Sequence, residues 1–347
     1  MRFLVAPDAF KGTLTAGDAA AAIAAGIREV LPDAEVIELP LADGGEGTAD
    51  ILSPYLPDDV CLIESAQLIG LNLPQMRSLD VMQRSSLPLG QAILAGLDAG
   101  KRDFVIGLGG SATNDGGLGI LMALGMQAVD RSGKPVEPNL AGLLSVHTVD
   151  RSALDPRLAE SRMTILSDVS SPLIGNHGAT AVYGPQKGLR TEDVDRVDRA
   201  IMLFAETSSL AFGSDPSRIP GAGAAGGLGF ALMLLDGVLV SGARFVMNAC
   251  GFASKIADVD WVITGEGRSD LQTLAGKLPL VVAKLARERG KAVAILSGSV
   301  DASALPRLTE FADYVAAAGE ELPGSSAEAF EWLKASAGRF AQTLQAS

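Results

Sequence analysis

The chain has 347 residues, with 28 Lys or Arg against 41 Asp or Glu, so its formal charge is −13 and its pI is about 4.7. This balance disfavours a nucleic-acid-binding protein, because affinity for phosphate backbones requires clustered cations. Apolar residues make up 48% of the chain and charged residues 20%, which excludes intrinsic disorder. The length favours two domains.

The mean hydropathy of +0.27 raises the question of a membrane. The most apolar stretch, Gly229 to Met247, contains Asp236 and Arg244, so no membrane span is predicted. The chain has only two cysteines and two histidines, which disfavours a disulfide framework, a Ser-His-Asp triad and a multi-histidine zinc site. We therefore expect a cytoplasmic protein with no disulfide framework, no Ser-His-Asp triad and no multi-histidine zinc site.

The N-terminal segment predicts alternating strands and helices. Residues Arg2 to Ala6 form an apolar run, and the Thr15/Asp18 pair predicts a capping box before a helix that ends at Pro32. Glu35 to Leu39 reads as a second strand, and a further helix is expected from about Glu46. This order is typical of a parallel sheet with crossover helices.

The same alternation returns near the C-terminus. Three strands, two helices and a Ser325/Glu328 capping box are predicted there, with strands at Trp261–Thr264, Ala292–Leu296 and Asp313–Ala316 and helices at Leu278–Arg289 and after Ser325. Together with the two early strands they predict a five-stranded, doubly wound α/β sheet interrupted by a long insertion.

The insertion is long enough to form a second α/β domain. Its predicted strands are Phe104–Ile106 and Met163–Leu166, and its predicted helices are Leu118–Met126 and Val194–Leu210. The predicted boundaries are 1–56 plus 258–347 for the first domain and 57–257 for the second. We expect the active site in a cleft between them.

The 40 glycines are the informative excess, and they gather in loops with polar residues. Six such loops stand out: PDAFKGT (7–13), ADGGEGT (42–48), GLGGSATNDGG (107–117), GPQKG (184–188), PGAGAAGG (220–227) and TGEGRSD (264–270). Because the carboxyl ends of parallel strands face the ligand, the first, second and last should converge at one edge of the sheet.

GLGGSATNDGG is the strongest local pattern. It follows a predicted buried strand, precedes a helix and offers bare amides beside polar side chains, a combination that suits phosphate oxygens. A capped tight turn is the alternative interpretation. The predicted nucleotide-binding residues are Gly109, Gly110, Ser111, Thr113, Asn114 and Asp115.

The chain also contains two matches to a dinucleotide-binding pattern. Gly107, Gly109 and Ala112 fit G-x-G-x-x-[GA] with Asp130 downstream, so a dinucleotide site is conceivable. A second match at Gly221 follows no strand and is rejected. A Walker A loop is absent, so a kinase built on this chain is not a P-loop enzyme.

The loops also carry carboxylates and cations. Carboxylates can hold Mg²⁺ or accept a hydroxyl proton, and cations neutralise transferring phosphate, so the mixture suits phosphoryl transfer. The acids are Asp8, Asp43, Glu46, Asp168, Glu266 and Asp270, and the cations are Lys11, Lys187, Arg268 and Lys277. For each acid alone, an N-cap or a loop ion pair is an equally good interpretation.

Taken together, the ordered motifs resemble the bacterial glycerate kinase family. APD-x-F-K, ADGGEGT, GGSATNDGG, D-V-x-x-P-L, GPQKG, PGAGAAGG and TGEGR-x-D-x-Q followed by GK-x-P occur in the family's order over nearly the whole chain. The resemblance implies ATP-dependent phosphorylation of D-glycerate at the 2-hydroxyl, giving 2-phosphoglycerate. It also implies a flavodoxin-like domain with an inserted α/β domain, with Mg²⁺ as cofactor.

We predict roles for the loop residues on this basis. Asp43 is the expected proton acceptor, with Lys187 and Asp168 as further catalytic residues. Lys11 and Arg268 are expected to pair with the glycerate carboxylate, with Asp8 and Asp270 beside them. Glu46, Asp168 and Glu266 are the expected metal ligands. The expected ligands are glycerate and ATP, with neither nucleic acid nor membrane as a partner, and a homodimer is left open.

Two alternatives to the kinase remain open on the sequence. One is a nicotinamide-dependent oxidoreductase of a small hydroxy acid that uses the Gly107 pattern with Asp130. The other is a regulatory protein that binds glycerate or ATP without turnover, suggested by an abbreviated segment after Thr48.

Overall fold

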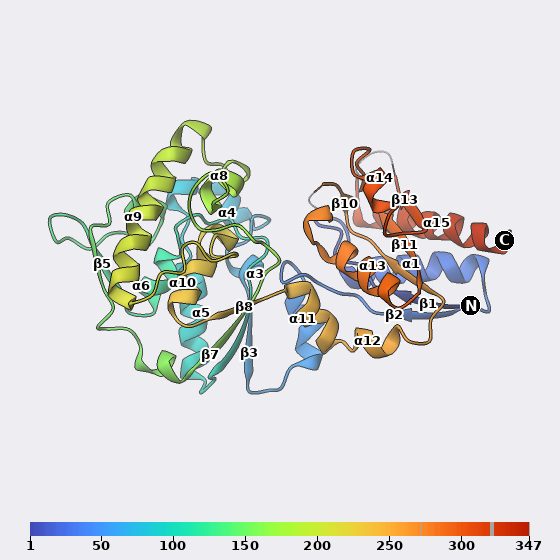
Figure 1. Cartoon of the computed structure of the whole chain (residues 1–347), viewed down its shortest axis with the longest axis horizontal. Helices are drawn as coiled ribbons and strands as arrows, with labels where there is room; N and C mark the ends of the chain where they lie inside the picture. The colour runs from blue at the N-terminus through green and yellow to red at the C-terminus, as the bar shows by residue number, and fades with distance from the viewer. Residues whose placement is uncertain (272, 320–322, 347) are drawn as a thin grey trace. The chain divides into compact units, whose positions relative to one another are not determined.

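The computed structural model describes residues 1–271, 273–319 and 323–346. The chain forms two compact units (Figure 1): residues 1–55 with 243–347 make the first, and residues 56–242 make the second. The second boundary lies at 242/243, whereas the sequence analysis placed it at 257/258, because the segment that carries α11 (Gly242–Ala249) and α12 (Phe252–Lys255) packs with the first unit.

The first unit is built on a parallel five-stranded sheet with strand order β13-β11-β9-β1-β2. The strands are β1 (Arg2–Val5), β2 (Glu35–Glu38), β9 (Trp261–Thr264), β11 (Ala292–Ser297) and β13 (Tyr314–Ala317). All five predicted strands are therefore present, within one or two residues of the predicted ends.

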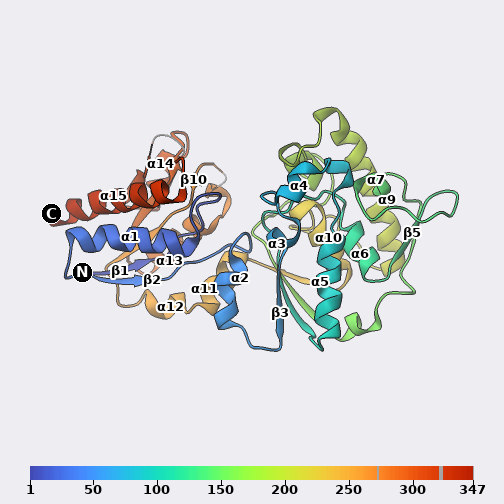
Figure 2. The same ribbon diagram turned by 180° about the vertical axis from the view of Figure 1, so that it is seen from behind.

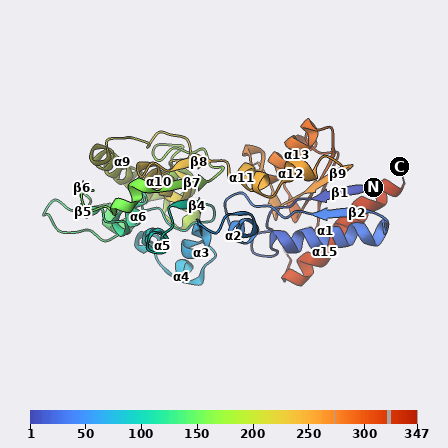
Figure 3. The same ribbon diagram turned by 90° about the horizontal axis from the view of Figure 1, so that it is seen from below.

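Helices cover both faces of this sheet. Figure 3 shows α12 and α13 (Leu278–Glu288) on one side of the strands and α1 (Ala16–Val30) and α15 (Ser326–Gln345) on the other. The predicted capping boxes are confirmed, since Thr15 Oγ1 accepts the Asp18 amide at 3.0 Å and Ser325 Oγ accepts the Glu328 amide at 3.2 Å. The unit also contains α2 (Thr48–Leu52), α14 (Leu305–Leu308) and the short pair β10 (Arg268–Ser269) and β12 (Ser299–Val300).

Helices α1 and α15 run side by side (Figure 2), and a glycine permits their close approach. A Cβ on Gly26 would lie 2.1 Å from the Lys334 carbonyl oxygen. Phe3 of β1, Ile23 of α1 and Phe340 of α15 are fully buried in the core that the two helices share with the sheet. The core thus fixes the strands whose ends carry the polar loops.

The second unit contains a parallel four-stranded sheet with order β3-β4-β7-β8. Its strands are β3 (Val60–Glu64), β4 (Asp103–Gly107), β7 (Arg162–Leu166) and β8 (Val238–Val240), and β5 (Gln127–Val129) pairs antiparallel with β6 (Thr148–Asp150). Its helices are α3 (Ser65–Ile69), α4 (Pro74–Ser78), α5 (Leu87–Asp98), α6 (Leu118–Ala123), α7 (Leu140–Leu143), α8 (Ala179–Tyr183), α9 (Val194–Phe212) and α10 (Leu228–Leu234).

Two predicted helices are shorter than expected. The helix predicted over Leu118–Met126 ends at Ala123, because Gly125 adopts a φ of +108° that turns the chain into β5. The helix predicted from Glu46 begins at Thr48, since Gly47 at its start has a φ of +85°. Glycine conformation therefore sets the end of the first helix and the start of the second.

No helix in the described part of the chain is long and apolar enough to cross a membrane.

Candidate active site

The loops after β1 and β9 meet at the carboxyl ends of the first unit's sheet. The Asp8 amide donates to the Gly265 carbonyl at 2.9 Å, and Thr264 Oγ1 donates to the Ala6 carbonyl at 2.8 Å. Strand β10, in the loop after β9, pairs with β12, which follows β11. The predicted convergence of these loops is confirmed.

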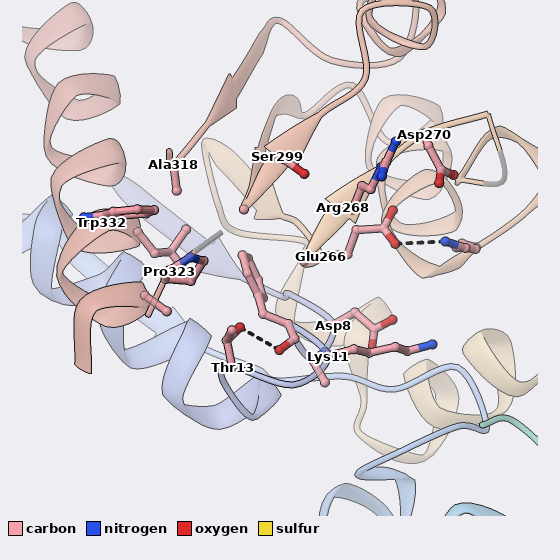
Figure 4. Close-up of a pocket in the computed structure, with 17 residues that line it drawn as sticks. Asp8, Lys11, Thr13, Glu266, Arg268, Asp270, Ser299, Ala318, Pro323 and Trp332 are labelled. Atoms are coloured by element: carbon pink, nitrogen blue, oxygen red, sulfur yellow. Dashed lines mark hydrogen bonds and ion pairs between the residues drawn. The ribbon is translucent and has the colours of Figure 1, made fainter. Parts of the chain in front are cut away.

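A pocket of about 400 Å³ opens between these loops and the start of α15 (Figure 4). Its two ends differ in chemistry. Figure 4 shows the charged side chains at one end, and Ala318, Pro323 and Trp332 at the other. The charged lining comprises Asp8, Lys11, Glu266, Arg268, Asp270 and Lys277.

Asp8 is the most deeply buried acid of the pocket, with 4% of its surface exposed. Burial raises the pKa of Asp8 well above its usual value, and the nearby Asp43 carboxylate raises it further, whereas Lys11 opposes the shift. Asp8 therefore keeps its proton to a higher pH than an ordinary aspartate.

Lys11 lies among acids. Lys11 is exposed, and partial desolvation of its amine lowers the pKa, but Asp43 and Asp8, followed by Glu266 and Glu46, outweigh that effect and raise the pKa of Lys11. Asp43 follows β2 on the predicted ADGGEGT loop, where its Oδ1 accepts the Gly45 amide at 3.0 Å. The second loop therefore also reaches this edge of the sheet, as predicted.

Glu266 is held by three neighbours. Thr273 Oγ1 donates to its carboxylate at 2.6 Å, Lys277 Nζ at 3.3 Å and Ser269 Oγ at 3.4 Å. Burial raises the pKa of Glu266, and the Lys277 amine opposes that effect. Lys277 is thereby fixed beside the pocket as a third cation.

Arg268 lines the pocket from an exposed position. Its side chain is 67% exposed and forms an ion pair with Asp301 at 3.3 Å. Asp270 is half-buried, and its amide donates to Thr273 Oγ1 at 3.0 Å. Both line the pocket, so the four predicted substrate-binding residues share one space.

In the second unit, the glycine-rich loop 107–117 is mostly buried. Ser111, Thr113, Asn114 and Asp115 are between 0% and 3% exposed, whereas Gly110 is exposed. Two buried oxygens, Thr113 Oγ1 and Asn114 Oδ1, have no hydrogen-bond partner among the described residues. Nucleotide binding by this loop stays a prediction.

Packing explains many of the glycines in this unit. A Cβ on Gly226 would lie 2.1 Å from the Thr113 carbonyl oxygen, and one on Gly227 would lie 2.5 Å from Gly116 Cα. The PGAGAAGG and GLGGSATNDGG loops therefore pack backbone against backbone. That contact requires Gly226 and Gly227 independently of any ligand.

Asp115 has a structural role. Its Oδ2 accepts the Ser86 amide at 2.7 Å and the Ser86 hydroxyl at 2.8 Å, and its Oδ1 accepts the Gly117 amide at 3.1 Å. Both oxygens are thus used within the unit. We drop Asp115 from the nucleotide-binding set.

Lys187 joins the GPQKG turn to the glycine-rich loop. Its Nζ donates to the Thr113 carbonyl at 2.7 Å and to Ser111 Oγ at 3.2 Å, and the side chain is buried. Arg84 Nη1 donates to the Lys187 carbonyl at 2.6 Å from the other side. Burial lowers the pKa of Lys187 to about 7.

This depressed pKa predicts a specific pH dependence. Between about pH 10.5 and pH 7 the unfolded chain binds a proton at Lys187 that the folded chain does not, so lowering the pH destabilises the fold through this group. Lys187→Met removes the effect, so stability relative to the wild type should rise as the pH falls through this window. Urea unfolding at several pH values checks it, with the exposed Lys134→Met as control. A difference independent of pH would contradict the assignment.

The oxidoreductase interpretation is wrong. Asp130 would have to end a parallel strand next to β4, but it follows β5 of the antiparallel pair. Its Oδ1 accepts the Ser132 and Lys134 amides at 2.8 and 3.0 Å, which makes it a turn residue.

The predicted metal ligands are not assembled within either unit. Among the residues described, no three Asp, Glu, His or Cys side chains are grouped closely enough to hold a metal ion. Glu46 and Glu266 belong to the first unit, and Asp168, half-buried after β7, belongs to the second. The carboxylates around Lys11 nevertheless have the chemistry of Mg²⁺ ligands, since Mg²⁺ commonly takes one or two carboxylates together with substrate phosphates.

The sequence analysis missed the apolar end of the pocket. Trp332 lies there (Figure 4), and Phe10 and Leu333 are further apolar residues of the pocket lining. The last helix was recognised by its capping box, but nothing in its own sequence showed that its first turns border the loops of β1 and β9.

The fold and the pocket define an α/β protein with a charged pocket at the carboxyl ends of a parallel sheet. The chain belongs to the glycerate kinase family, whose model matches residues 3–58 and 54–345. It is similar to the glycerate kinase of Haemophilus influenzae, 40% identical over 86% of each chain, and to the glycerate 2-kinase of Escherichia coli K12, 37% identical over 86% of each. A crystal structure described as a candidate glycerate kinase 2 from Salmonella typhimurium LT2 matches with a TM-score of 0.80 and 36% identity, covering 100% of this chain and 98% of that one. The chain is thus a phosphotransferase with glycerate kinase activity, and its family implies ATP as the phosphate donor.

Proposed function

We propose that this enzyme phosphorylates D-glycerate at the 2-hydroxyl and releases 2-phosphoglycerate. The observation that carries the proposal is the charged end of the pocket, where Lys11, Arg268 and Lys277 face one space beside Asp8 and Glu266. Two anions, ATP and glycerate, must approach each other in this reaction, so cations beside carboxylates are what it needs. The name of the Escherichia coli relative supports the 2-position.

In this proposal Asp43 orients the glycerate hydroxyl and accepts its proton. The transition state of phosphoryl transfer is loose, so the carboxylate acts mainly by positioning. Lys11, whose charge is favoured by four surrounding acids, neutralises the phosphate as it transfers. Lys187, buried in the second unit, is a positioning residue that holds the glycine-rich loop.

We propose Glu46 and Glu266 as the Mg²⁺ ligands. Both are carboxylates, and both lie near enough to Lys11 to raise its pKa. Bound there, the ion would neutralise phosphate charge. Asp168 stays a proposed ligand from the second unit.

For the architecture, we propose a flavodoxin-like domain into which the second domain is inserted. Numbered in chain order within the first unit, the strands run 2-1-3-4-5, the order of flavodoxin-like sheets. The first unit consists of two segments of chain that flank the second.

Turnover with defined product analysis tests the function. We expect D-glycerate and ATP to yield ADP and a product that enolase consumes directly, because enolase accepts 2-phosphoglycerate and not the 3-isomer. A product that requires phosphoglycerate mutase first would overturn the 2-position. Absence of ADP release with D-glycerate, L-glycerate and glycolate alike would overturn the kinase proposal and favour the regulatory alternative.

A further inference from the structure

We infer that the pocket of the first unit is the nucleotide site, with the base against Trp332 and the phosphates at Lys11, Lys277 and Arg268. This inference rests on the proposed kinase function and decides which of its two ligands the pocket holds. It reverses two expectations of the sequence analysis, which gave this pocket to glycerate and the nucleotide to the loop 107–117.

Size is the first argument. At about 30 Å³ per water molecule, a three-carbon acid displaces only on the order of 100 Å³. The pocket holds about 400 Å³, within the range typical of sites for much larger organic ligands. Glycerate alone would leave most of it to solvent.

The chemistry of the two ends is the second argument. Glycerate carries a hydroxyl or a carboxylate oxygen on every carbon and has no apolar part to place against Phe10, Trp332 and Leu333. A nucleotide has an aromatic base at one end and a run of anionic phosphates at the other, which matches an apolar end and a cationic end in a single pocket (Figure 4).

The backbone makes room for the indole of Trp332. A Cβ on Gly319 would lie 2.4 Å from Trp332 Cε3 and 2.6 Å from Cζ3, so the ring packs directly against the Gly319 main chain. The indole is thereby supported by the main chain, and the side chain remains only half-buried at the border of the pocket. A supported, partly exposed indole is suited to stacking on a base.

Topology is the third argument. In an open parallel sheet the ligand crevice lies where the strand order reverses, outside the carboxyl ends of the strands. Here the chain leaves β1 for β2 on one side and later returns to β9 on the other. The pocket is lined by the loops that follow β1 and β9, at Asp8–Thr13 and Glu266–Asp270.

The loop 107–117 is less suited to this ligand. Its Thr113 and Asn114 side chains are fully buried. A Cβ on its Gly117 would lie 2.3 Å from Ala231 Cβ and 2.9 Å from the Gly227 carbonyl oxygen, so packing within the unit requires this glycine. Its exposed part is small, around Gly110, and would suit a small anion better than a nucleotide.

The two tryptophans of the chain provide a matched test. Trp332 borders the pocket, whereas Trp261 starts β9, at the opposite end of that strand, and packs against Phe340. In Trp261→Phe, a non-hydrolysable ATP analogue should quench the remaining Trp332 emission, and in Trp332→Phe the emission of Trp261 should not respond. Trp332→Ala should weaken analogue binding about tenfold or more in calorimetry, because stacking on the base is lost.

Fragments of the nucleotide separate the two ends of the pocket. Inorganic tripolyphosphate should bind Trp332→Ala as it binds the wild type and should bind Lys11→Met more weakly. Adenosine should bind Trp332→Ala more weakly than the wild type and should bind Lys11→Met as it binds the wild type. If Trp332→Ala does not fold, the two phenylalanine variants still decide the question.

The inference is overturned if the analogue leaves Trp332 emission and Trp332→Ala affinity unchanged, or if D-glycerate alone quenches Trp332 and the nucleotide does not. These are binding readouts in the absence of turnover. A failure of the kinase proposal in the enolase assay is therefore distinguishable from a failure of this inference.

Discussion

Asp43→Asn is expected to lower kcat by about 100-fold or more while leaving nucleotide binding intact, because the variant loses the group that receives the glycerate proton. Asparagine retains an oxygen that can accept the Gly45 amide, as Asp43 Oδ1 does at 3.0 Å, so the loop should keep its conformation. The substitution therefore tests charge and proton affinity rather than shape.

Asp43 is preferred over Asp8 on electrostatic grounds. Asp8 is buried, and its burial together with the neighbouring Asp43 raises its pKa well above the usual value. When two carboxyl groups share a site, the one that holds its proton is the poorer proton acceptor. Asp43 is half-buried and lies near Lys11, whose pKa it raises.

The measurement is steady-state turnover with D-glycerate, combined with calorimetry of the ATP analogue. Asp33→Asn, an exposed aspartate in the turn before β2, is the matched control and should turn over normally. An Asp43→Asn enzyme with near-normal kcat would transfer the role to another group. A parallel loss of analogue binding would place Asp43 in nucleotide binding instead.

The sequence predicted the charged end of the pocket well, for a reason that lies in the topology. Asp8 and Lys11 follow β1, and Glu266 and Arg268 follow β9. In a parallel sheet all such positions face the same edge, so alternation of strands and helices suffices to bring them together even though more than 250 residues separate them.

The apolar end could not be predicted in the same way. Trp332 lies on a helix whose sequence indicates an amphipathic face but not which loop that face meets. Its place beside the pocket depends on the packing of α15 against α1 and on the absence of a side chain at Gly319. Both are tertiary contacts without a local pattern.

The glycine-rich loops show the converse limit. Glycines in loops indicate close approach of backbone to something, and the sequence analysis took that partner to be a ligand. In the second unit the partner is another loop, since Gly226 and Gly227 pack on Thr113 and Gly116 across more than 100 residues of sequence. A single sequence cannot distinguish the two cases, because each demands the same missing Cβ.

Gly265→Ala is expected to destabilise the first unit by about 3 kcal/mol or more, the upper range for overpacking at a rigid site. Gly265 directly follows β9 as the second residue of the TGEGRSD loop, and it is buried. A Cβ at this position would lie 1.7 Å from the Leu296 carbonyl oxygen and 2.7 Å from its carbonyl carbon. Those atoms belong to β11, the neighbouring strand, so no flexible side chain can move aside.

The same clash should also displace residues of the pocket. The Gly265 carbonyl accepts the Asp8 amide at 2.9 Å, and Glu266 follows directly in sequence, so separating β9 from β11 displaces two acids of the charged end. Urea unfolding should show a lower midpoint, and turnover at a temperature where the variant remains folded should fall as well.

Gly17→Ala in α1 is the control, because its Cβ would find only Thr15 Oγ1 at 3.7 Å and alanine favours the helix. That variant should be as stable as the wild type or slightly more so. Equal stability of both variants would mean that β9 and β11 are not packed as closely as Gly265 requires.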